Sequence, residues 1–98
     1  MSRVELAPEI RDDFDRILDQ LEEHDVEGIP ARIHEITQAF DVLEANPLIG
    51  RRAPLDKRAL VIGRGSHGYV ALYRYVLGID TVFVLALRSQ SEAGYKHE

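Results

Sequence analysis

The chain of 98 residues contains no cysteine, and its one methionine is the first residue. Without cysteine, neither a disulfide framework nor a thiolate metal site can form, which agrees with a reducing compartment. No apolar run approaches the roughly 18 to 20 residues that a membrane-spanning helix needs. The first residues are acidic, whereas a secretory signal is basic and then apolar. We therefore expect a cytoplasmic protein that does not enter a membrane.

The composition is that of an ordinary globular protein, with 45% hydrophobic and 30% charged residues. A chain of this length forms one domain, and folding buries roughly two-thirds of the surface that the unfolded chain exposes. We find no internal repeat, no low-complexity segment and no linker. The sequence therefore predicts a single domain over residues 1–98 with a modest core.

The net charge of −5 hides a division along the chain. Residues 1–50 carry four basic and thirteen acidic side chains, a balance of −9, whereas residues 51–98 carry eight and four, a balance of +4. A field of one sign attracts partners of the opposite sign, so the basic half is a candidate face for nucleic acid or for an acidic protein. The alternative is that solvated helices are simply acidic.

The first half of the chain has the period of helices. In residues 7–25 apolar side chains recur on one face, Pro8 suits a first helical position, and acidic residues suit the positive end of the helix dipole. A second helix is expected from Ile29 to the segment "ANP", with Pro30 near its start. Before the first helix, the apolar residues Val4 and Leu6 alternate with polar residues, as in a short strand. We expect the two helices to form an antiparallel hairpin.

The second half has the period of strands. The segments "RALVI", "YVALYRYVL" and "TVFVLALR" are rich in β-branched and aromatic residues and are separated by the turn-forming segments "GRGSHG" and "GID". In the middle segment both faces are mostly apolar, with one face formed by Tyr69, Ala71, Tyr73, Tyr75 and Leu77. This strand is therefore expected inside the sheet, with one sheet face packed on the helices. The order predicts a small α+β domain.

The turn "GRGSHG" has the spacing of a dinucleotide-binding loop, through Gly63, Gly65 and Gly68. Those loops bind pyrophosphate only where a strand leads into a helix, and here a second strand follows. We therefore interpret the glycines as positions of positive φ in a hairpin loop.

The candidate catalytic and metal-binding residues do not form a recognisable pattern. The four histidines have no pair at helical spacing, so we expect exposed polar histidines and no metal site; they are His24, His34, His67 and His97. No Gly-x-Ser-x-Gly turn is present. No cofactor is predicted.

The basic residues are better placed. Four of them, Arg51, Arg52, Lys57 and Arg58, are expected in the connection between the second helix and the sheet. Arg64 is expected on a hairpin, and Arg74 and Arg88 on strands. Residues of one sheet face converge even when they are distant in sequence, so a cationic patch for phosphates or acidic side chains is one interpretation. Unrelated surface charges are the other.

Three segments in this order resemble the RelE/ParE superfamily of bacterial toxins. They are "LEANPLIGRR" after the second helix, "GYVALYRY" on the middle strand and "VFVLALRSQSEAGY" near the end. The resemblance implies a RelE/ParE-like β-α-α-β-β-β fold, with a helical hairpin packed on a small, mainly antiparallel sheet. It also implies a toxin of a type II toxin–antitoxin system, neutralised by an antitoxin with which it forms a hetero-oligomer. RelE-like members cleave messenger RNA on the ribosome, and ParE-like members, often called plasmid stabilization proteins, poison DNA gyrase.

The residues favour the ParE-like branch. A metal-free ribonuclease needs clustered Lys, Arg, His or Tyr groups to activate a 2′-hydroxyl and to stabilise charge on the phosphate. The positions that match the RelE-like cluster carry no charge here, namely Val61, Gly63 and Val70, with Gln90 in place of an arginine and Ser89 in place of a histidine. Tyr95 is the one remaining match. The sequence therefore favours inhibition by protein binding, and enzymatic activity is not expected.

The resemblance and the charge pattern together give a set of candidate contact residues for the target or the antitoxin, namely Arg51, Arg52, Arg64, Arg74, Arg88 and Tyr95. The two alternatives to a gyrase inhibitor are a ribosome-dependent messenger RNA endoribonuclease, with Arg88 and Tyr95 as its catalytic residues, and a degenerate, non-toxic module that only binds antitoxin. An isolated toxin should expose apolar surface between helices and sheet or along a strand edge.

Overall fold

The computed structural model describes residues 1–24, 27–92, 94 and 95. Two helices and five strands follow one another in the order β1 (Arg3–Leu6), α1 (Ile10–Glu23), α2 (Ile29–Ala45), β2 (Arg51–Ala53), β3 (Lys57–Ile62), β4 (Tyr69–Val76) and β5 (Thr81–Ser89). Short 3-10 turns, η1 (Gly65–His67) and η2 (Leu77–Ile79), connect the last three strands. The predicted α+β class is confirmed.

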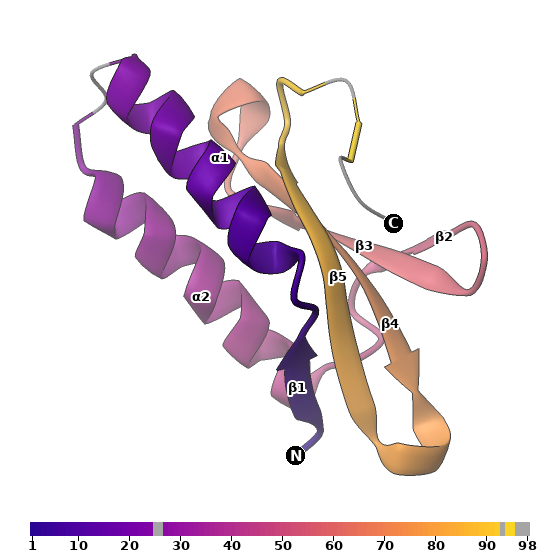
Figure 1. Ribbon diagram of the computed structural model, residues 1–98. Coiled ribbons are helices and arrows are strands. Elements are labelled where there is room, and N and C mark those ends of the chain that lie inside the picture. The colour runs from indigo at the N-terminus through magenta and orange to yellow at the C-terminus, as the bar shows by residue number, and fades with distance from the viewer. Residues whose placement is uncertain (25–26, 93, 96–98) are drawn as a thin grey trace.

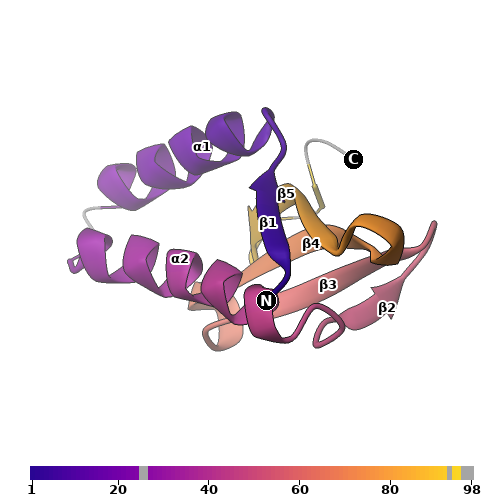
Figure 2. The same ribbon diagram turned by 90° about the horizontal axis from the view of Figure 1, so that it is seen from below.

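All five strands form one sheet in the order β1-β5-β4-β3-β2. Neighbouring strands are antiparallel except for β1, which pairs with β5 in parallel. The sheet is therefore mainly antiparallel, as expected, and β4 lies inside it. Figures 1 and 2 show the two helices side by side, running in opposite directions on the same side of the sheet.

The core lies between the helices and the sheet. The apolar faces of α1 and α2 contribute Ile17, Ile36 and Leu43, each at most 1% exposed, and the rings of Phe14 and Phe40 meet edge to face with centroids 6.4 Å apart. Burying one such aliphatic side chain contributes roughly 1.5–3 kcal/mol, so this contact between the helices and the sheet is the main stabilising element. No helix in the described part of the chain is long and apolar enough to cross a membrane.

Two of the segments that carry the family resemblance contact each other. The amide of Gly50 donates a hydrogen bond of 2.8 Å to the hydroxyl of Tyr73, which is fully buried. A Cβ atom at position 50 would lie 2.7 Å from the ring of Tyr73 and 2.9 Å from the carbonyl oxygen of Ala59. Glycine is therefore required here because the chain passes close to the tyrosine.

Four details of the predicted elements were wrong. Arg51 and Arg52, expected in a connection, form the edge strand β2, and Lys57 and Arg58 begin β3. Pro8 lies in a turn before the helix, because α1 begins only at Ile10. Leu77 lies outside β4, in η2, and is 78% exposed. Gly68 has a φ of −85° and is required for lack of space, since a Cβ there would lie 2.7 Å from the carbonyl oxygen of Ile62.

The other two glycines of the loop between β3 and β4 behave as expected. Gly63 and Gly65 have φ values of 77° and 58°, in the left-handed region that favours glycine. The loop leads from a strand into a strand, so it has the hairpin architecture that the sequence indicated.

Candidate functional site

The two faces of β4 and β5 have different surroundings. On one face, Ala71 pairs with Leu87 and Tyr73 with Val84, and these four residues belong to the core beneath the helices. Side chains alternate along a strand, so the residues between them point to the opposite face, away from the helices, which we call the open face. Its margins are accessible, but Val70 and Leu72 at its centre are only 5% and 3% exposed. The register shift between Leu72 and Tyr73 leaves Leu85 as the extra residue of a β-bulge.

A row of three residues crosses the open face. Val61 on β3 pairs with Val70 on β4, and Val70 pairs with Arg88 on β5. Directly paired residues have their side chains on the same face of the sheet. The row therefore brings together two positions that match the RelE-like catalytic cluster, and both are valine.

The chain after β5 returns to this row. The guanidinium carbon of Arg88 lies 5.2 Å from the centre of the Tyr95 ring, which is a cation–π contact. The Nη1 atom of Arg88 donates to the carbonyl oxygens of Ser89 and Glu92, at 3.1 and 3.3 Å. The Nε atom of Arg88 is buried and has no hydrogen-bond partner in the described part of the chain. The guanidinium of Arg88, a predicted site residue, therefore mainly contacts the segment that follows it in the chain.

That C-terminal segment is attached to α1 through Glu92. Arg16 donates to both oxygens of Glu92, at 2.7 and 3.2 Å, and Gln20 and the backbone amide of Ser89 each donate to it at 2.9 Å. Burial by itself would raise the pKa of Glu92, but the hydrogen bonds from Arg16, Gln20 and Ser89 outweigh it and hold the pKa below its usual value. We call this set of contacts the tail latch.

Arg16, which binds Glu92, also binds a carboxylate buried in the core, that of Asp13. Asp13 is 0% exposed; its Oδ1 accepts a hydrogen bond of 2.7 Å from Arg16, and its Oδ2 accepts one of 2.9 Å from the backbone amide of Leu87. Asp13, Arg16 and Glu92 were not among the site residues predicted from the sequence. A signal was present, because Asp13 lies three residues after Ile10 and four before Ile17, on the apolar face of α1.

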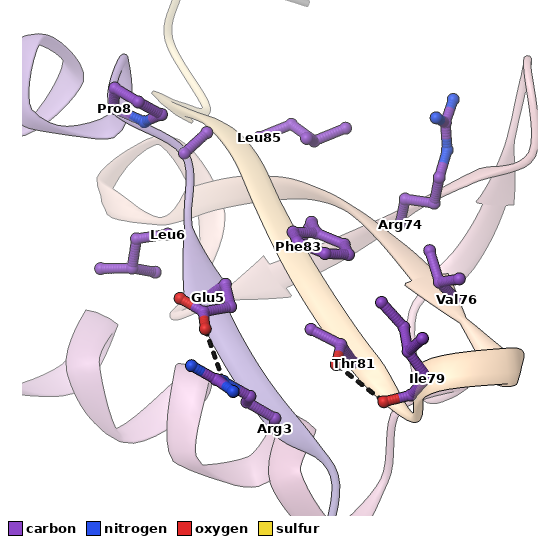
Figure 3. Close-up of a pocket in the computed structure, with 11 residues that line it drawn as sticks. Arg3, Glu5, Leu6, Pro8, Arg74, Val76, Ile79, Thr81, Phe83 and Leu85 are labelled. Carbon is purple, nitrogen blue, oxygen red and sulfur yellow. Dashed lines mark hydrogen bonds and ion pairs between the residues drawn. The ribbon is translucent and has the colours of Figure 1, made fainter.

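An apolar groove lies beside the edge strand β1. It has a volume of about 680 Å³ and is lined mainly by Leu6, Pro8, Val76, Ile79, Phe83 and Leu85. Figure 3 shows the exposed ion pair between Arg3 and Glu5 at the same groove. This is one of the two places where the sequence led us to expect exposed apolar surface.

The candidate arginines are divided by the sheet. Arg74 lies on the open face opposite Phe83, and its Nη2 donates to the carbonyl of Leu55 at 3.0 Å. Arg51 also belongs to the open face. It pairs with Ala59, and Ala59 pairs with Leu72, which lies on that face. Arg74, like Arg88, has a buried Nε without a partner among the described residues. The structure therefore brings Arg51, Arg74, Arg88 and Tyr95 to one face of the sheet.

The remaining two candidate arginines lie elsewhere. Arg52 pairs with Arg58 and so belongs to the opposite face of β2, and Arg64 is exposed in the loop between β3 and β4. Arg58 has a structural role, because its Nη1 donates to the carbonyls of Leu48 and Gly50 at 3.2 and 2.9 Å.

Three of the histidines, His24, His34 and His67, are exposed as expected, and His97 lies outside the described residues. Within the described ranges no three His, Cys, Asp or Glu side chains converge as a metal site would require. However, His24 and His67 line the same cavity, which their separation in the sequence did not indicate.

Comparisons with known proteins agree with the architecture. The family model described as "ParE toxin of type II toxin-antitoxin system, parDE" matches residues 4–94. Neither the curated proteins nor the solved structures gave a match. The match covers all but the first residue of β1, both helices and the row on the open face, and extends to Gly94. The chain therefore belongs to the ParE toxin family of type II toxin–antitoxin systems.

Proposed function

We propose that this toxin inhibits DNA gyrase by protein binding and that an antitoxin neutralises it by covering the open face of the sheet. One observation carries the proposal: the row on the open face contains Val61 and Val70 beside Arg88. Valine supplies neither a general base nor a charge for a phosphate, so this face is suited to contact rather than to RNA cleavage.

The charges of the open face support the same conclusion. Arg51 is exposed, and Arg74 and Arg88 are partly exposed around an apolar centre. Interfaces commonly combine an apolar centre with arginine at its edge, and complementary charge raises the association rate. An acidic, partly apolar segment of the target or antitoxin is the partner that this surface fits.

The direct test is a supercoiling assay with purified gyrase and saturating toxin, in which we expect inhibition. The double variant Arg51→Ala with Arg74→Ala should weaken inhibition about tenfold or more, since arginine is enriched among the few residues that carry most of the binding energy of an interface. Arg11→Ala, which removes an exposed arginine of α1, is the matched control and should inhibit as the parent does. Normal supercoiling at saturating toxin would refute the gyrase proposal.

The contact between Arg88 and Tyr95 favours a second candidate, ribosome-dependent cleavage of messenger RNA. This alternative predicts specific cleavage of ribosome-bound message that is lost in Tyr95→Phe and in Arg88→Ala. Toxin that gives neither cleavage, nor gyrase inhibition, nor growth arrest when expressed alone would be a degenerate module that only binds antitoxin.

A further inference from the structure

The hairpin loop between β2 and β3 projects from the edge of the sheet. Figures 1 and 2 show it on the side of the molecule away from both helices. Its tip consists of three exposed residues, Pro54, Leu55 and Asp56. Leu55 is 77% exposed and does not belong to the core. The hairpin therefore presents an apolar side chain to its surroundings.

The backbone of Leu55 is strained. Its φ is 61° and that of Asp56 is 60°, so two consecutive residues lie in the left-handed region. Hairpin turns with two positive φ values normally use Asn-Gly or Asp-Gly, because a larger side chain there crowds the following carbonyl oxygen. An exposed leucine at an ordinary φ needs no explanation, whereas a strained leucine that buries little within its own chain indicates a contact outside it.

The conformation of the tip is fixed from the open face. The Nη2 atom of Arg74 donates a hydrogen bond of 3.0 Å to the carbonyl oxygen of Leu55. Pro54, directly before Leu55, has a φ that its ring restricts. The leucine is therefore positioned before any partner binds, which reduces the entropy lost on binding.

Positive charge surrounds the tip. Residues 51–58 carry four basic side chains and one acidic one. Arg51 and Arg52 are exposed, and neither has an ion pair among the residues that the structure describes. An apolar tip in a positive field fits an apolar pocket that is bordered by acidic side chains.

We propose that the β2–β3 hairpin enters the protein target of the toxin, where Leu55 occupies an apolar pocket bordered by carboxylates. This inference rests on the proposed inhibition of gyrase by protein binding and adds the element and the side chain that make the contact. Arg51 belongs to the open face and Arg52 to the opposite face of β2, so the two arginines meet carboxylates on both sides of the pocket.

The test measures inhibition of gyrase supercoiling against toxin concentration, with the full chain and without antitoxin. Leu55→Asn should weaken inhibition about tenfold or more, since burial of a leucine side chain corresponds to at least that factor in a binding constant. Its midpoint of thermal unfolding should rise by a few degrees, because asparagine tolerates a positive φ better than leucine. The hydrogen bond from Arg74 goes to the backbone, so the substitution leaves it in place.

Two further variants control for polarity and for position. Leu55→Met keeps an apolar side chain of similar volume and should inhibit within a few-fold of the parent. Val42→Asn replaces an exposed apolar residue of α2 and should inhibit as the parent does.

A fourth variant tests the acidic border. Arg52→Ala should weaken inhibition a few-fold, and its difference from the parent should shrink as the salt concentration rises, because exposed charges are screened. A difference that does not change with salt would remove the acidic border from the proposal.

Other outcomes would overturn the proposal. Equal inhibition by Leu55→Asn and the parent would show that the hairpin does not contact gyrase, and would leave gyrase inhibition in place. Weaker inhibition together with a lower unfolding midpoint would show that Leu55 is structural. Self-association of the parent that Leu55→Asn abolishes, measured by sedimentation, would assign the hairpin to a second copy of the chain. A parent without effect on gyrase would refute the proposed function and this contact with it.

Discussion

At the scale of single residues, Asp13 is the most informative side chain. Its carboxylate is fully buried and accepts hydrogen bonds from both the amide of Leu87 near the end of β5 and the guanidinium of Arg16. A buried charge is tolerated when it is paired and hydrogen-bonded, and removing one partner of such a pair commonly costs 3–5 kcal/mol. Asp13 thus fixes α1 relative to β5 as well as supporting the tail latch.

We therefore expect Asp13→Ala to lower the free energy of unfolding by about 3 kcal/mol, because it leaves the Leu87 amide and Arg16 without this acceptor. Chemical denaturation followed by circular dichroism measures the change. Asp15→Ala, at an exposed position of the same helix, is the control and should change stability by less than about 0.5 kcal/mol. Equal effects of the two substitutions would contradict the role given to Asp13.

At the scale of elements, the segment after β5 contacts both α1 and the open face of the sheet. Glu92 binds Arg16 and Gln20 of α1, and Tyr95 lies over Arg88 on the open face. The tail latch therefore holds Glu92 against α1 three residues before Tyr95, which contacts Arg88.

The tail latch should depend on pH. The pKa of Glu92 is lowered in the folded protein from its ordinary value of 4.5, so its contribution to stability is present above pH 4.5 and is lost as the pH falls through the folded pKa. Glu92→Gln should lower stability by about 1–2 kcal/mol at pH 7, and the difference from the parent should shrink below pH 4.5. Denaturation of both proteins between pH 7 and pH 3 measures this difference.

The comparison with Glu92→Gln is necessary because other carboxyls titrate in the same range. Hydrogen bonds from Ser2 and Tyr75 also lower the pKa of Asp80, so the stability of the parent alone reports on both groups. A difference between parent and variant that stays constant across the range would contradict the tail latch.

The elements also show how far the sequence could predict the fold. Amphipathic periods placed α1, α2 and four of the strands, because side-chain spacing directly reflects which face is buried. β2 was missed because it has only three residues and two of them are exposed arginines, so no alternation of apolar residues marks it. β2 pairs with β3 because β3 would otherwise leave its backbone N–H and C=O groups unpaired at the edge of the sheet. This edge exists only once the sheet has assembled.

At the scale of the whole molecule, apolar surface remains exposed in the absence of a partner. Leu77 and Ile79 are 78% and 62% exposed in η2, and Ile79 lines the groove beside β1. Exposed apolar groups that border a groove are typical of interaction sites. The groove is near Arg74 of the open face, so one partner segment can contact both.

We expect co-expression with a cognate antitoxin to raise the soluble yield of the toxin, because a bound partner would cover this surface. Comparison of soluble and total toxin with and without the antitoxin measures the effect, and an unrelated protein of similar size is the control. In the absence of antitoxin, Leu77→Ser with Ile79→Ser should also raise the yield. Equal yield in all three cases would contradict an exposed binding surface.

The sequence by itself determined the class of fold and the family. Periods of three to four and of two residues define helices and strands, and the segments around Gly50, Tyr73 and Tyr95 carry the resemblance that the family model confirms over residues 4–94. Gyrase as the target and the role of the candidate arginines stay predictions.

The tertiary structure alone decided which groups meet. The pairing of β3, β4 and β5 set Val61 and Val70 beside Arg88, and packing of the helices on the sheet brought His24 and His67 to one cavity. The physical reason is that local spacing fixes the face on which a side chain lies, whereas strand register and helix packing arise from contacts between segments far apart in the chain.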